Sequence, residues 1–356
     1  MRIRESIGIT FDDVLLIPKK SNIKSRSQID LSSHLTTKIK LKVPIISANM
    51  DTVTESTMAI AVAQAGGIGI IHRFLTIDVQ AQKVKRVKDK RLLVGAAIGV
   101  RDDYAKRASA LVKSGVDVIV IDIAHGHSKY LIEVLKNLKK KFPKLQIIAG
   151  NIATGEAAEE LIHHGADAVK VGIGPGSICI TRLVAGAGVP QVTAIDDVVQ
   201  VARRKNIPVI ADGGIRTSGD IVKALATGAS TVMIGSVFAG AEESPTVMIT
   251  KDNKKFKLTR GMASLAAYQD NQKNGDHKNG NGVKKDLETY AAEGVEAMIP
   301  YRGTAKNIIE KMAGGIRSGF SYCGSKNIEE LWKNAEFVRI STNSLVESRA
   351  HDVVEV

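Results

Sequence analysis

The sequence predicts a single (β/α)8 barrel, an α/β fold in which eight parallel strands alternate with helices. Eight short apolar runs recur along the chain, most of them starting 20 to 30 residues after the last, and segments with helical periodicity lie between them. The runs show no clear alternation of apolar and polar residues, which is typical of strands buried on both faces of a parallel sheet. An open, doubly wound sheet is the competing arrangement, but eight regular units favour closure.

The predicted strands are spread over residues 43–236. They cover residues 43–48, 67–72, 92–98, 117–122, 145–150, 167–173, 207–214 and 230–236. Clear helical segments between them cover residues 104–115, 128–142, 155–165 and 218–228. No linker or further repeat marks a second domain, so we expect one catalytic barrel domain over residues 1–356.

Two intervals are longer than a barrel unit requires. About 40 residues separate the start of the sixth strand from that of the seventh, and residues 241–303 follow the eighth strand. Because the chemistry of such a barrel lies at the carboxyl ends of its strands, we expect an active-site loop after the sixth strand and a mobile flap at about 241–303. The middle of the flap, residues 269–286, is polar and rich in Gly and Asn. A disordered surface loop is the alternative for this segment.

The composition excludes several classes of protein. The net charge is +13, but the basic clusters at 84–91 and 136–142 fall on predicted helix faces. A solvated face explains them, and a small anionic ligand explains the positive field, so no nucleic-acid partner is expected. No apolar run reaches the roughly 20 residues of a membrane span, and the start lacks the apolar core of a signal peptide. The two cysteines form neither a disulfide framework nor a metal-ligand pattern, so we expect a cytoplasmic protein.

Three Gly-rich segments end predicted strands, at residues 172–177, 211–216 and 233–236. The seventh and eighth strands of such barrels often form a phosphate site from backbone N–H groups. Candidate phosphate ligands are Gly213, Gly214, Gly235 and Ser236, with the Ser177 hydroxyl beside them. Asp212 ends an apolar strand and could hold ribose hydroxyls, or it could be a structural carboxylate satisfied by backbone N–H groups.

Cys179 lies in the Gly-rich loop after the sixth strand, two residues before Thr181. A free cysteine is most often a small buried hydrophobe, but the polar surroundings argue against burial here. A thiolate in this place could add covalently to an electrophilic carbon. Cys323 lies beyond the barrel strands, where a structural role is expected.

Six segments together resemble the inosine monophosphate (IMP) dehydrogenase and guanosine monophosphate (GMP) reductase family. They are GIGPGSICITR, SANMDTVTES, IDIAHGHSKY, ADGGIRTSGD, MIGSVFAGAEESP and AEFVRISTNSLVES. The resemblance runs from residue 9 to the C-terminus. The family's regulatory CBS pair would fall between the second and third strands, where this chain runs straight through, so no CBS domain is expected.

The resemblance implies a role for each candidate residue. Cys179 would attack C2 of a purine monophosphate, and the adduct would exchange a hydride with NADP(H) or NAD(H), while Thr181 and Glu293 handle protons. Substrate would be bound by Ser177, Asp212, Gly213, Gly214, Gly235, Ser236, Gly261, Met262 and Glu293. The cofactor would lie beside Asp122, Gly172, Ile173 and Gly174. Carbonyls of Gly174, Gly176 and Cys179 would bind K⁺, with Glu347, Ser348 and Arg349 of a neighbouring subunit completing the site in a homotetramer.

The family contains two reactions, and the flap favours the reductase. A dehydrogenase must activate water, and in that branch an Arg-Tyr pair on the flap does so. This chain has no arginine between Arg260 and Arg302, and none of its tyrosines there follows an arginine. We therefore expect GMP and NADPH to give IMP and ammonia. The alternative is oxidation of IMP by NAD⁺ to xanthosine monophosphate (XMP).

Some features point the other way. The segments GVPQVTAI and ESRAHDV resemble dehydrogenases, although Thr259 stands where dehydrogenases commonly carry a tyrosine that contacts phosphate. Two further alternatives are a barrel that binds nucleotides without catalysis and a flavin mononucleotide-dependent oxidoreductase barrel. The set of Cys179, Thr181 and Glu293 argues against the non-catalytic barrel.

Overall fold

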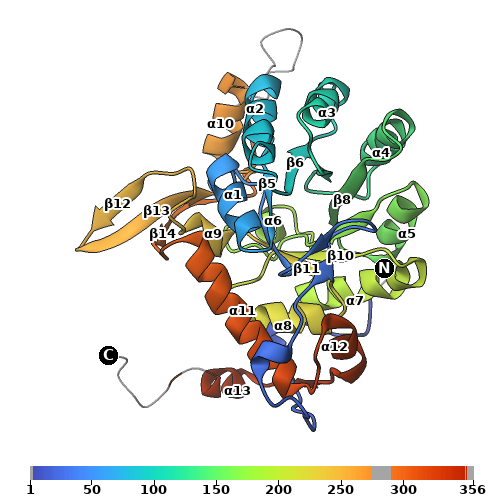
Figure 1. Cartoon of the computed structure of the whole chain (residues 1–356), viewed down its shortest axis with the longest axis vertical. Helices are drawn as coiled ribbons and strands as arrows, with labels where there is room; N and C mark the ends of the chain where they lie inside the picture. The colour runs from blue at the N-terminus through green and yellow to red at the C-terminus, as the bar shows by residue number, and fades with distance from the viewer. Residues whose placement is uncertain (1–2, 275–289, 349, 351–356) are drawn as a thin grey trace.

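The structure, a computed structural model, describes residues 3–274, 290–348 and 350. Within these residues a closed barrel of parallel strands confirms the predicted fold (Figure 1). The strands follow one another around the barrel in sequence order, and the barrel closes where Val232 pairs with Ile45. They are β4 (Ile45–Ser47), β5 (Ile68–Ile71), β6 (Val94–Ile98), β7 (Val118–Asp122), β8 (Gln146–Ile152), β9 (Ala168–Val171), β10 (Val209–Asp212) and β11 (Thr231–Ile234).

Both faces of the strands are buried, which explains why the sequence shows no alternation. On β7, Val118 and Val120 belong to the cluster inside the barrel, whereas Ile119 and Ile121 pack outward against the helices. All four side chains are fully buried. Two apolar layers are therefore built from one continuous apolar run, as expected for a parallel sheet.

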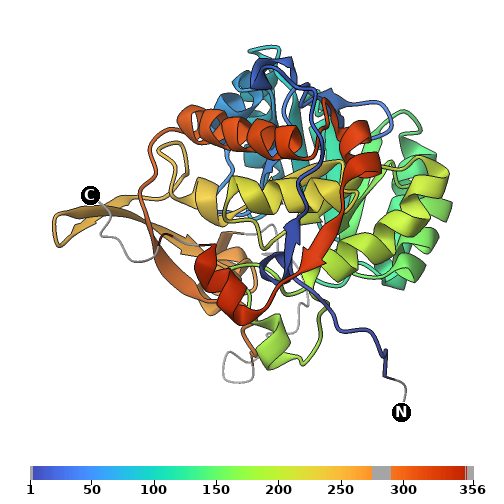
Figure 2. The same cartoon turned by 90° about the horizontal axis from the view of Figure 1, so that it is seen from below.

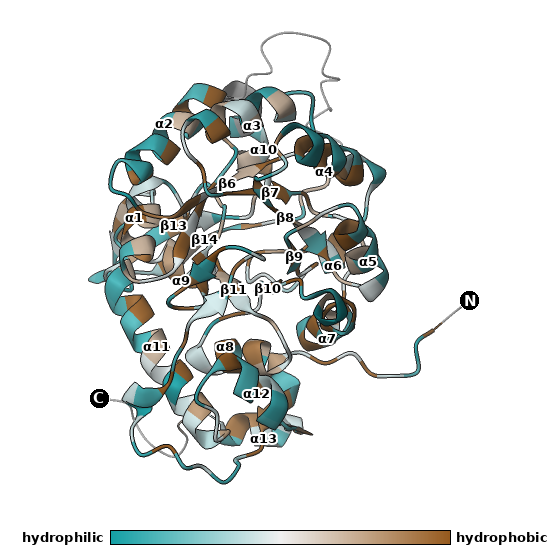
Figure 3. Cartoon of the chain, turned by 45° about the vertical axis from the view of Figure 1, so that its right-hand side comes forward, coloured by the Kyte–Doolittle hydropathy of each residue, from teal (hydrophilic) through white to brown (hydrophobic). Residues whose placement is uncertain are grey.

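The helices surround the barrel and have mixed hydropathy along their length (Figure 3). Several begin at a threonine whose hydroxyl accepts a backbone N–H, such as Thr154 and Thr217, and these caps fix where the helices start. The ring consists of α1 (Ser56–Gln64), α2 (Ile77–Lys88), α3 (Tyr104–Lys113), α4 (Lys129–Lys141), α5 (Gly155–His163), α7 (Gln191–Ala202), α8 (Ser218–Ala226) and α11 (Ala305–Tyr322). The four helical segments predicted from the sequence coincide with α3, α4, α5 and α8.

The remaining elements close the ends of the barrel. The hairpin of β2 (Ser33–His34) and β3 (Lys40–Leu41) brings Leu35 and Leu41 into the interior cluster. A strand from the N-terminal part of the chain, β1 (Val14–Leu16), pairs antiparallel with one from the C-terminal part, β15 (Phe337–Arg339). Short helices complete the fold: η1 (Phe11–Asp13), η2 (Arg26–Gln28), α6 (Thr181–Val184), η3 (Arg203–Lys205), α9 (Ser236–Ala239), α12 (Ile328–Asn334) and α13 (Thr342–Glu347).

The described part of the predicted flap, at about 241–303, contains regular secondary structure. It includes an antiparallel sheet of β12 (Met248–Lys251), β13 (Lys254–Arg260) and β14 (Glu296–Pro300), with α10 (Leu265–Asn274) between β13 and β14 in the sequence. The β12–β13 hairpin projects away from the barrel in both views (Figures 1 and 2). Of the polar stretch 269–286, residues 269–274 belong to α10 and residues 275–286 lie outside the described residues.

The hairpin has a local signal that the sequence interpretation overlooked. Asp252 and Asn253 join β12 to β13, and both have positive φ angles, of 50° and 57°. Two such residues make the turn that matches the twist of a hairpin, and Asn and Asp are among the residues that adopt it most easily. Within the flap, the buried Lys257 ammonium of β13 donates to the carbonyls of Ala241, Glu242 and Ser244 at 2.8 to 3.1 Å, which ties the sheet to the segment that follows α9.

In the described residues, no helix is long and apolar enough to cross a membrane.

Candidate active site

Cys179 lies on the loop that leaves the carboxyl end of β9. Its backbone N–H donates to the Gly176 carbonyl at 3.1 Å, which closes a turn under the side chain. The Cys179 Sγ lies 3.2 Å from the Thr181 Oγ1, and the side chain of Cys179 is half-buried. The loop therefore presents a thiol and a hydroxyl as one hydrogen-bonded pair. Cys323, by contrast, is buried at the end of α11, and burial raises the pKa of its thiol.

The flap pairs directly with this loop. Ile180 N–H donates to the Glu293 carbonyl at 2.9 Å, and Val295 N–H donates to the Ile178 carbonyl at 3.0 Å. These bonds place Glu293 opposite the Cys179–Thr181 pair, although more than 110 residues separate them in the sequence. Burial, together with the nearby Glu293 carboxylate, raises the pKa of Tyr290. The three residues expected to do the chemistry are thus brought together.

Gly261 and Met262, the residues expected to meet the base, lie beside the place where the flap pairs with the Cys179 loop. Gly261 N–H donates to the Val295 carbonyl at 3.0 Å. A Cβ on Gly261 would lie 2.9 Å from the Gly294 Cα, so only glycine allows the two backbones to approach this closely. The Met262 Sδ accepts the backbone N–H of Asp51, on the loop after β4, at 3.4 Å.

The predicted phosphate ligands converge from three strand ends. The Ser177 hydroxyl, after β9, lies 3.5 Å from the Ser236 hydroxyl, after β11. Gly213 and Gly214 follow β10 with φ angles of 100° and 79°, and a Cβ on Gly213 would lie 2.8 Å from the Pro175 Cγ. Gly235 immediately precedes α9. Small residues therefore leave backbone groups and two hydroxyls facing one place, as a phosphate cradle requires.

A buried lysine links the two predicted ligand carboxylates. The Lys170 ammonium donates to Asp122 at 2.8 Å and to Asp212 at 2.6 Å, and its side chain is only 2% exposed. Asn151 also donates to Asp212 at 2.9 Å and accepts from Lys170. Both contacts to Asp212 are made by Oδ2, and 20% of this side chain stays exposed. Asp212 is therefore held by the side chains of Lys170 and Asn151, and not by the backbone N–H groups expected of a structural carboxylate, while part of it stays open to solvent.

In the cluster of Lys170, Asp122 and Asp212, neighbouring opposite charges offset the effect of burial on the pKa values of Lys170 and Asp122. Burial alone would lower the pKa of Lys170, but the two carboxylates outweigh it and raise that pKa. Burial alone would raise the pKa of Asp122, but the Lys170 ammonium, helped by Arg73, keeps it below its usual value. Lys170 and Asp122 therefore stabilise each other in their charged forms. Sequence reasoning missed Lys170, although a single lysine within the apolar run of β9 was a signal of a buried partner.

The residues expected beside a cofactor also lie at this rim. Gly172, Ile173 and Gly174 follow β9 directly, and a Cβ on Gly172 would lie 1.9 Å from the Asp212 carbonyl oxygen. Gly172 therefore packs against the strand that carries the predicted ribose ligand. Asp122 ends β7 on the same side of the barrel.

The residues expected to bind K⁺ fall in two separate places. Gly174, Gly176 and Cys179 share the loop after β9, whereas Glu347 ends α13 and Ser348 follows it. In this chain α13 contacts η1 and lies away from α6 (Figure 1). Arg349 lies outside the described residues. Across the described ranges, no group of three or more His, Cys, Asp or Glu could hold a metal ion.

Comparison with known proteins agrees with this geometry. The family model described as IMP dehydrogenase / GMP reductase domain matches residues 8–351. The inosine-5'-monophosphate dehydrogenase of Borreliella burgdorferi is 44% identical over 98% of this chain and 98% of its own. The GMP reductase of Leishmania donovani is 36% identical over 97% of each chain.

A solved structure gives the same result. The crystal structure of a cysteine-to-alanine variant of GMP reductase from Trypanosoma brucei, in complex with guanosine 5'-monophosphate, superimposes with a TM-score of 0.91 and 34% identity over 98% of each chain. With a closed barrel, a thiol beside the flap crossing and a family match over nearly the whole length, this chain belongs to the IMP dehydrogenase / GMP reductase family of NAD(P)-dependent oxidoreductases.

Proposed function

We propose that this chain is a GMP reductase, which converts GMP and NADPH to IMP and ammonia. One observation carries the proposal: Cys179 and Thr181 form a pair at 3.2 Å with Glu293 across from them, on a flap that contains no arginine between Arg260 and Arg302. The site thus has a nucleophile and proton-transfer groups but lacks the flap arginine to which the resemblance assigns water activation in dehydrogenases.

Substrate binding follows from the groups at the rim. The 5'-phosphate is held by the hydroxyls of Ser177 and Ser236 and the backbone N–H groups around Gly213, Gly214 and Gly235. The ribose hydroxyls donate to the exposed oxygen of Asp212, whose other oxygen is fixed by Lys170 and Asn151. The base lies against Gly261, Met262 and Glu293, which places its C2 atom toward Cys179.

The reaction then needs one covalent intermediate. The Cys179 thiolate adds to C2 of GMP, and Thr181 with Glu293 delivers a proton to the 2-amino group, which leaves as ammonia. Asp122 and Gly172–Gly174 would hold a reduced nicotinamide cofactor, which would supply a hydride to C2. The C2–S bond would then break, so that IMP would leave and Cys179 would be restored as the thiolate.

The dehydrogenase reaction is the second candidate, because inosine-5'-monophosphate dehydrogenases are among the most similar relatives. That reaction must hydrolyse the covalent intermediate, and Thr181 with Glu293 would then have to activate the water. General-base assistance is worth about 10²–10⁴-fold, so a flap without such a base favours the reductase. Thr259 also differs from the tyrosine that dehydrogenases commonly carry at this position, and its hydroxyl lies 3.3 Å from the Thr52 hydroxyl.

The finer features of the site are also proposals. We infer a single barrel domain without a CBS pair, because α2 is the element that joins β5 to β6. We infer a K⁺ ion on the carbonyls of Gly174, Gly176 and Cys179, supported by the turn at Gly176. Glu347, Ser348 and Arg349 from a neighbouring subunit of a homotetramer would complete it, and α13 lies too far from this loop to do so within one chain. A cytoplasmic location fits a chain with two free cysteines.

Two parallel assays test the reaction. GMP with NADPH and IMP with NAD⁺ are each mixed with the enzyme, and absorbance of the reduced cofactor is followed with product analysis. We expect oxidation of NADPH with formation of IMP and ammonia, and at most one equivalent of NADH from IMP. Sustained XMP production without GMP-dependent oxidation of NADPH would make the chain a dehydrogenase.

The variant Cys179→Ser is the control for the covalent step. It should bind GMP but lose turnover, because a serine hydroxyl is a far weaker nucleophile without a dedicated base. Turnover above about a tenth of the wild-type rate would rule out Cys179 as the nucleophile. A yellow purified protein with bound flavin would point to the flavin-dependent alternative.

A further inference from the structure

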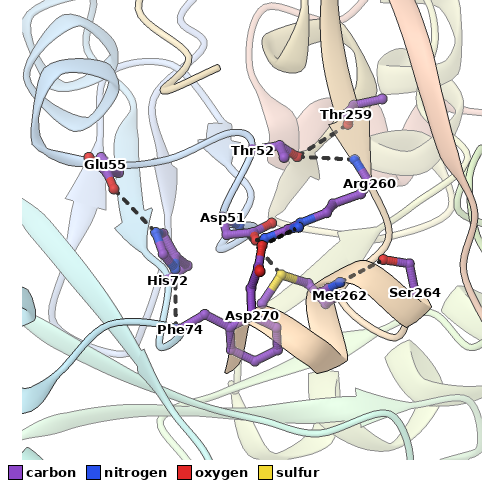
Figure 4. Close-up of polar contacts among 11 residues, drawn as sticks. Asp51, Thr52, Glu55, His72, Phe74, Thr259, Arg260, Met262, Ser264 and Asp270 are labelled. Atoms are coloured by element: carbon purple, nitrogen blue, oxygen red, sulfur yellow. Dashed lines mark hydrogen bonds and ion pairs between the residues drawn. The ribbon is translucent and has the colours of Figure 1, made fainter. Parts of the chain in front are cut away.

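Arg260, the last residue of β13, joins the flap to the barrel at the edge of the site (Figure 4). Its Nε and Nη2 donate to the Asp51 carboxylate at 2.9 and 2.6 Å, and its Nη1 donates to the Asp270 carboxylate at 2.7 Å. Asp51 lies on the loop after β4, and Asp270 lies on α10. The three residues, here called the rim clamp, therefore connect the barrel, the flap sheet and α10 through one guanidinium.

Asp51 is the fixed point of the rim clamp. Its side chain is only 9% exposed, and among the described residues its Oδ1 has no hydrogen-bond partner. Both contacts from Arg260 go to Oδ2, and the Asp51 backbone N–H donates to the Met262 Sδ. Asp51 thus contacts both Arg260 and Met262, which lie on either side of Gly261.

Thr52 adds a second contact at the same place. Its hydroxyl lies 3.3 Å from the Thr259 hydroxyl and accepts the backbone N–H of Arg260 at 3.4 Å. The backbone of β13 is thereby held to the barrel just before the chain turns into Gly261. The rigidity of the next two residues follows from these contacts, because Gly261 alone would leave the backbone unusually free.

We propose that Arg260 is a positioning residue that fixes the backbone of Gly261 and Met262 and so sets the affinity of the site for the purine base without touching it. The proposal rests on the proposed function, in which these two residues meet the base. A guanidinium suits this role because its planar fork holds one carboxylate with two N–H groups and still reaches a second. A lysine at this position would keep the charge but lose the fork.

The test compares Arg260→Met and Arg260→Lys with the wild type. We expect Arg260→Met to raise the KM for the monophosphate roughly tenfold or more, because the contacts that it removes order Gly261 and Met262. The value of kcat should change by less than about threefold, because none of these contacts holds Cys179. Arg260→Lys should give an intermediate KM. A folded Arg260→Met enzyme with wild-type KM, or with a loss in kcat alone, would overturn the proposal.

The matched control is Lys88→Met, which removes an ion pair of similar exposure at the other end of the barrel. The Lys88 ammonium contacts both Asp117 oxygens at 2.8 Å, and the two side chains are 27% and 21% exposed. If stability alone mattered, this variant and Arg260→Met would change KM alike. We expect Lys88→Met to keep the wild-type KM.

Hydrogen–deuterium exchange tests the rim clamp without any ligand. The N–H groups of Gly261 and Ser264 are bonded to the carbonyls of Val295 and Gly261 at 3.0 and 2.9 Å, and we expect both to exchange faster in Arg260→Met than in Lys88→Met. Equal exchange would overturn the proposal even if neither monophosphate is a substrate. If wild type binds no purine monophosphate but the exchange differs as expected, the proposed function fails while the rim clamp stands. Should Arg260→Met not fold, Arg260→Lys gives the same two readouts.

Discussion

Lys170 and Arg260 each stand between two carboxylates, one inside the barrel and the other at its rim. Lys170 has 2% of its side chain exposed, and its partners Asp122 and Asp212 have 21% and 20%. Arg260 has 21% exposed, Asp51 has 9%, and Asp270 has 44%. Both clusters combine one cation with two anions, so the difference between them lies in how much water reaches the charges.

The comparison shows what burial does to an ion pair. The Lys170 ammonium is almost wholly shielded from water, so water cannot easily replace Asp122 or Asp212 as its partner. At the rim, solvent can take over the contacts of Asp270, and salt can screen them. The interior cluster is therefore suited to hold ligand carboxylates in constant positions, whereas the rim clamp is suited to hold a segment that must still admit a substrate.

The variant Lys170→Met should have the largest effect, because it removes a fully buried cation from between Asp122 and Asp212, whose side chains are only 21% and 20% exposed. Breaking a buried pair costs about 3–5 kcal/mol, and urea denaturation should show a loss of this size in the free energy of unfolding. Lys170→Arg keeps the charge and serves as the control. A loss below about 1 kcal/mol for Lys170→Met would show that the interior cluster does not depend on its cation.

We expect an intermediate effect, on monophosphate binding, from Asp212→Ala but not from Asp122→Ala, although both residues are partners of Lys170. Asp212→Ala removes a charged acceptor for ribose hydroxyls, which costs about 1.5–3 kcal/mol, or roughly 10- to 100-fold in the dissociation constant of the monophosphate. Asp122→Ala removes a partner of the same lysine on the cofactor side and should leave that constant nearly unchanged. Titration calorimetry in a Cys179→Ser background measures both, and equal losses would refute the ribose role of Asp212.

The smallest effect is expected from Asp270→Asn at the outer end of the rim clamp. Nearly half of the Asp270 side chain is exposed, so the pair should contribute at most about 1 kcal/mol. Thermal unfolding at low salt should show this difference, and it should shrink as salt screens the pair. A larger or salt-independent loss would mean that the outer half of the rim clamp behaves like the interior cluster.

The barrel could be predicted from the sequence because its strands are buried on both faces and leave continuous apolar runs. The Gly-rich strand ends could be predicted for a similar reason, since a backbone that approaches a ligand or another strand requires glycine at Gly172 and Gly213. The pairing of Cys179 with Thr181 was also visible, because both lie on one short loop.

The contacts between distant segments could not be predicted in this way. Lys170 is unusual as a charged residue within the apolar run of β9, but its partners Asp122 and Asp212 cannot be identified from the sequence. Arg260 and Asp51 are 209 residues apart, and their contact depends on how the flap sheet returns to the barrel. The sheet within the predicted flap could not be read from the sequence, because neither the alternation in β13 nor the turn at Asp252–Asn253 was recognised in this polar segment.

The crossing of the flap with the Cys179 loop has a consequence for engineering. Gly261 is bonded to Val295, Glu293 N–H donates to the Ala263 carbonyl at 3.0 Å, and the rings of Tyr268 and Tyr290 stack with centroids 4.3 Å apart. The two ends of the intervening chain are therefore fastened together independently of its length. Doubling the length of such a loop costs only about 0.6 kcal/mol. A domain with adjacent termini, inserted between Asn274 and Tyr290, should therefore leave the bonds of Gly261 to Val295 and of Glu293 to Ala263 in place.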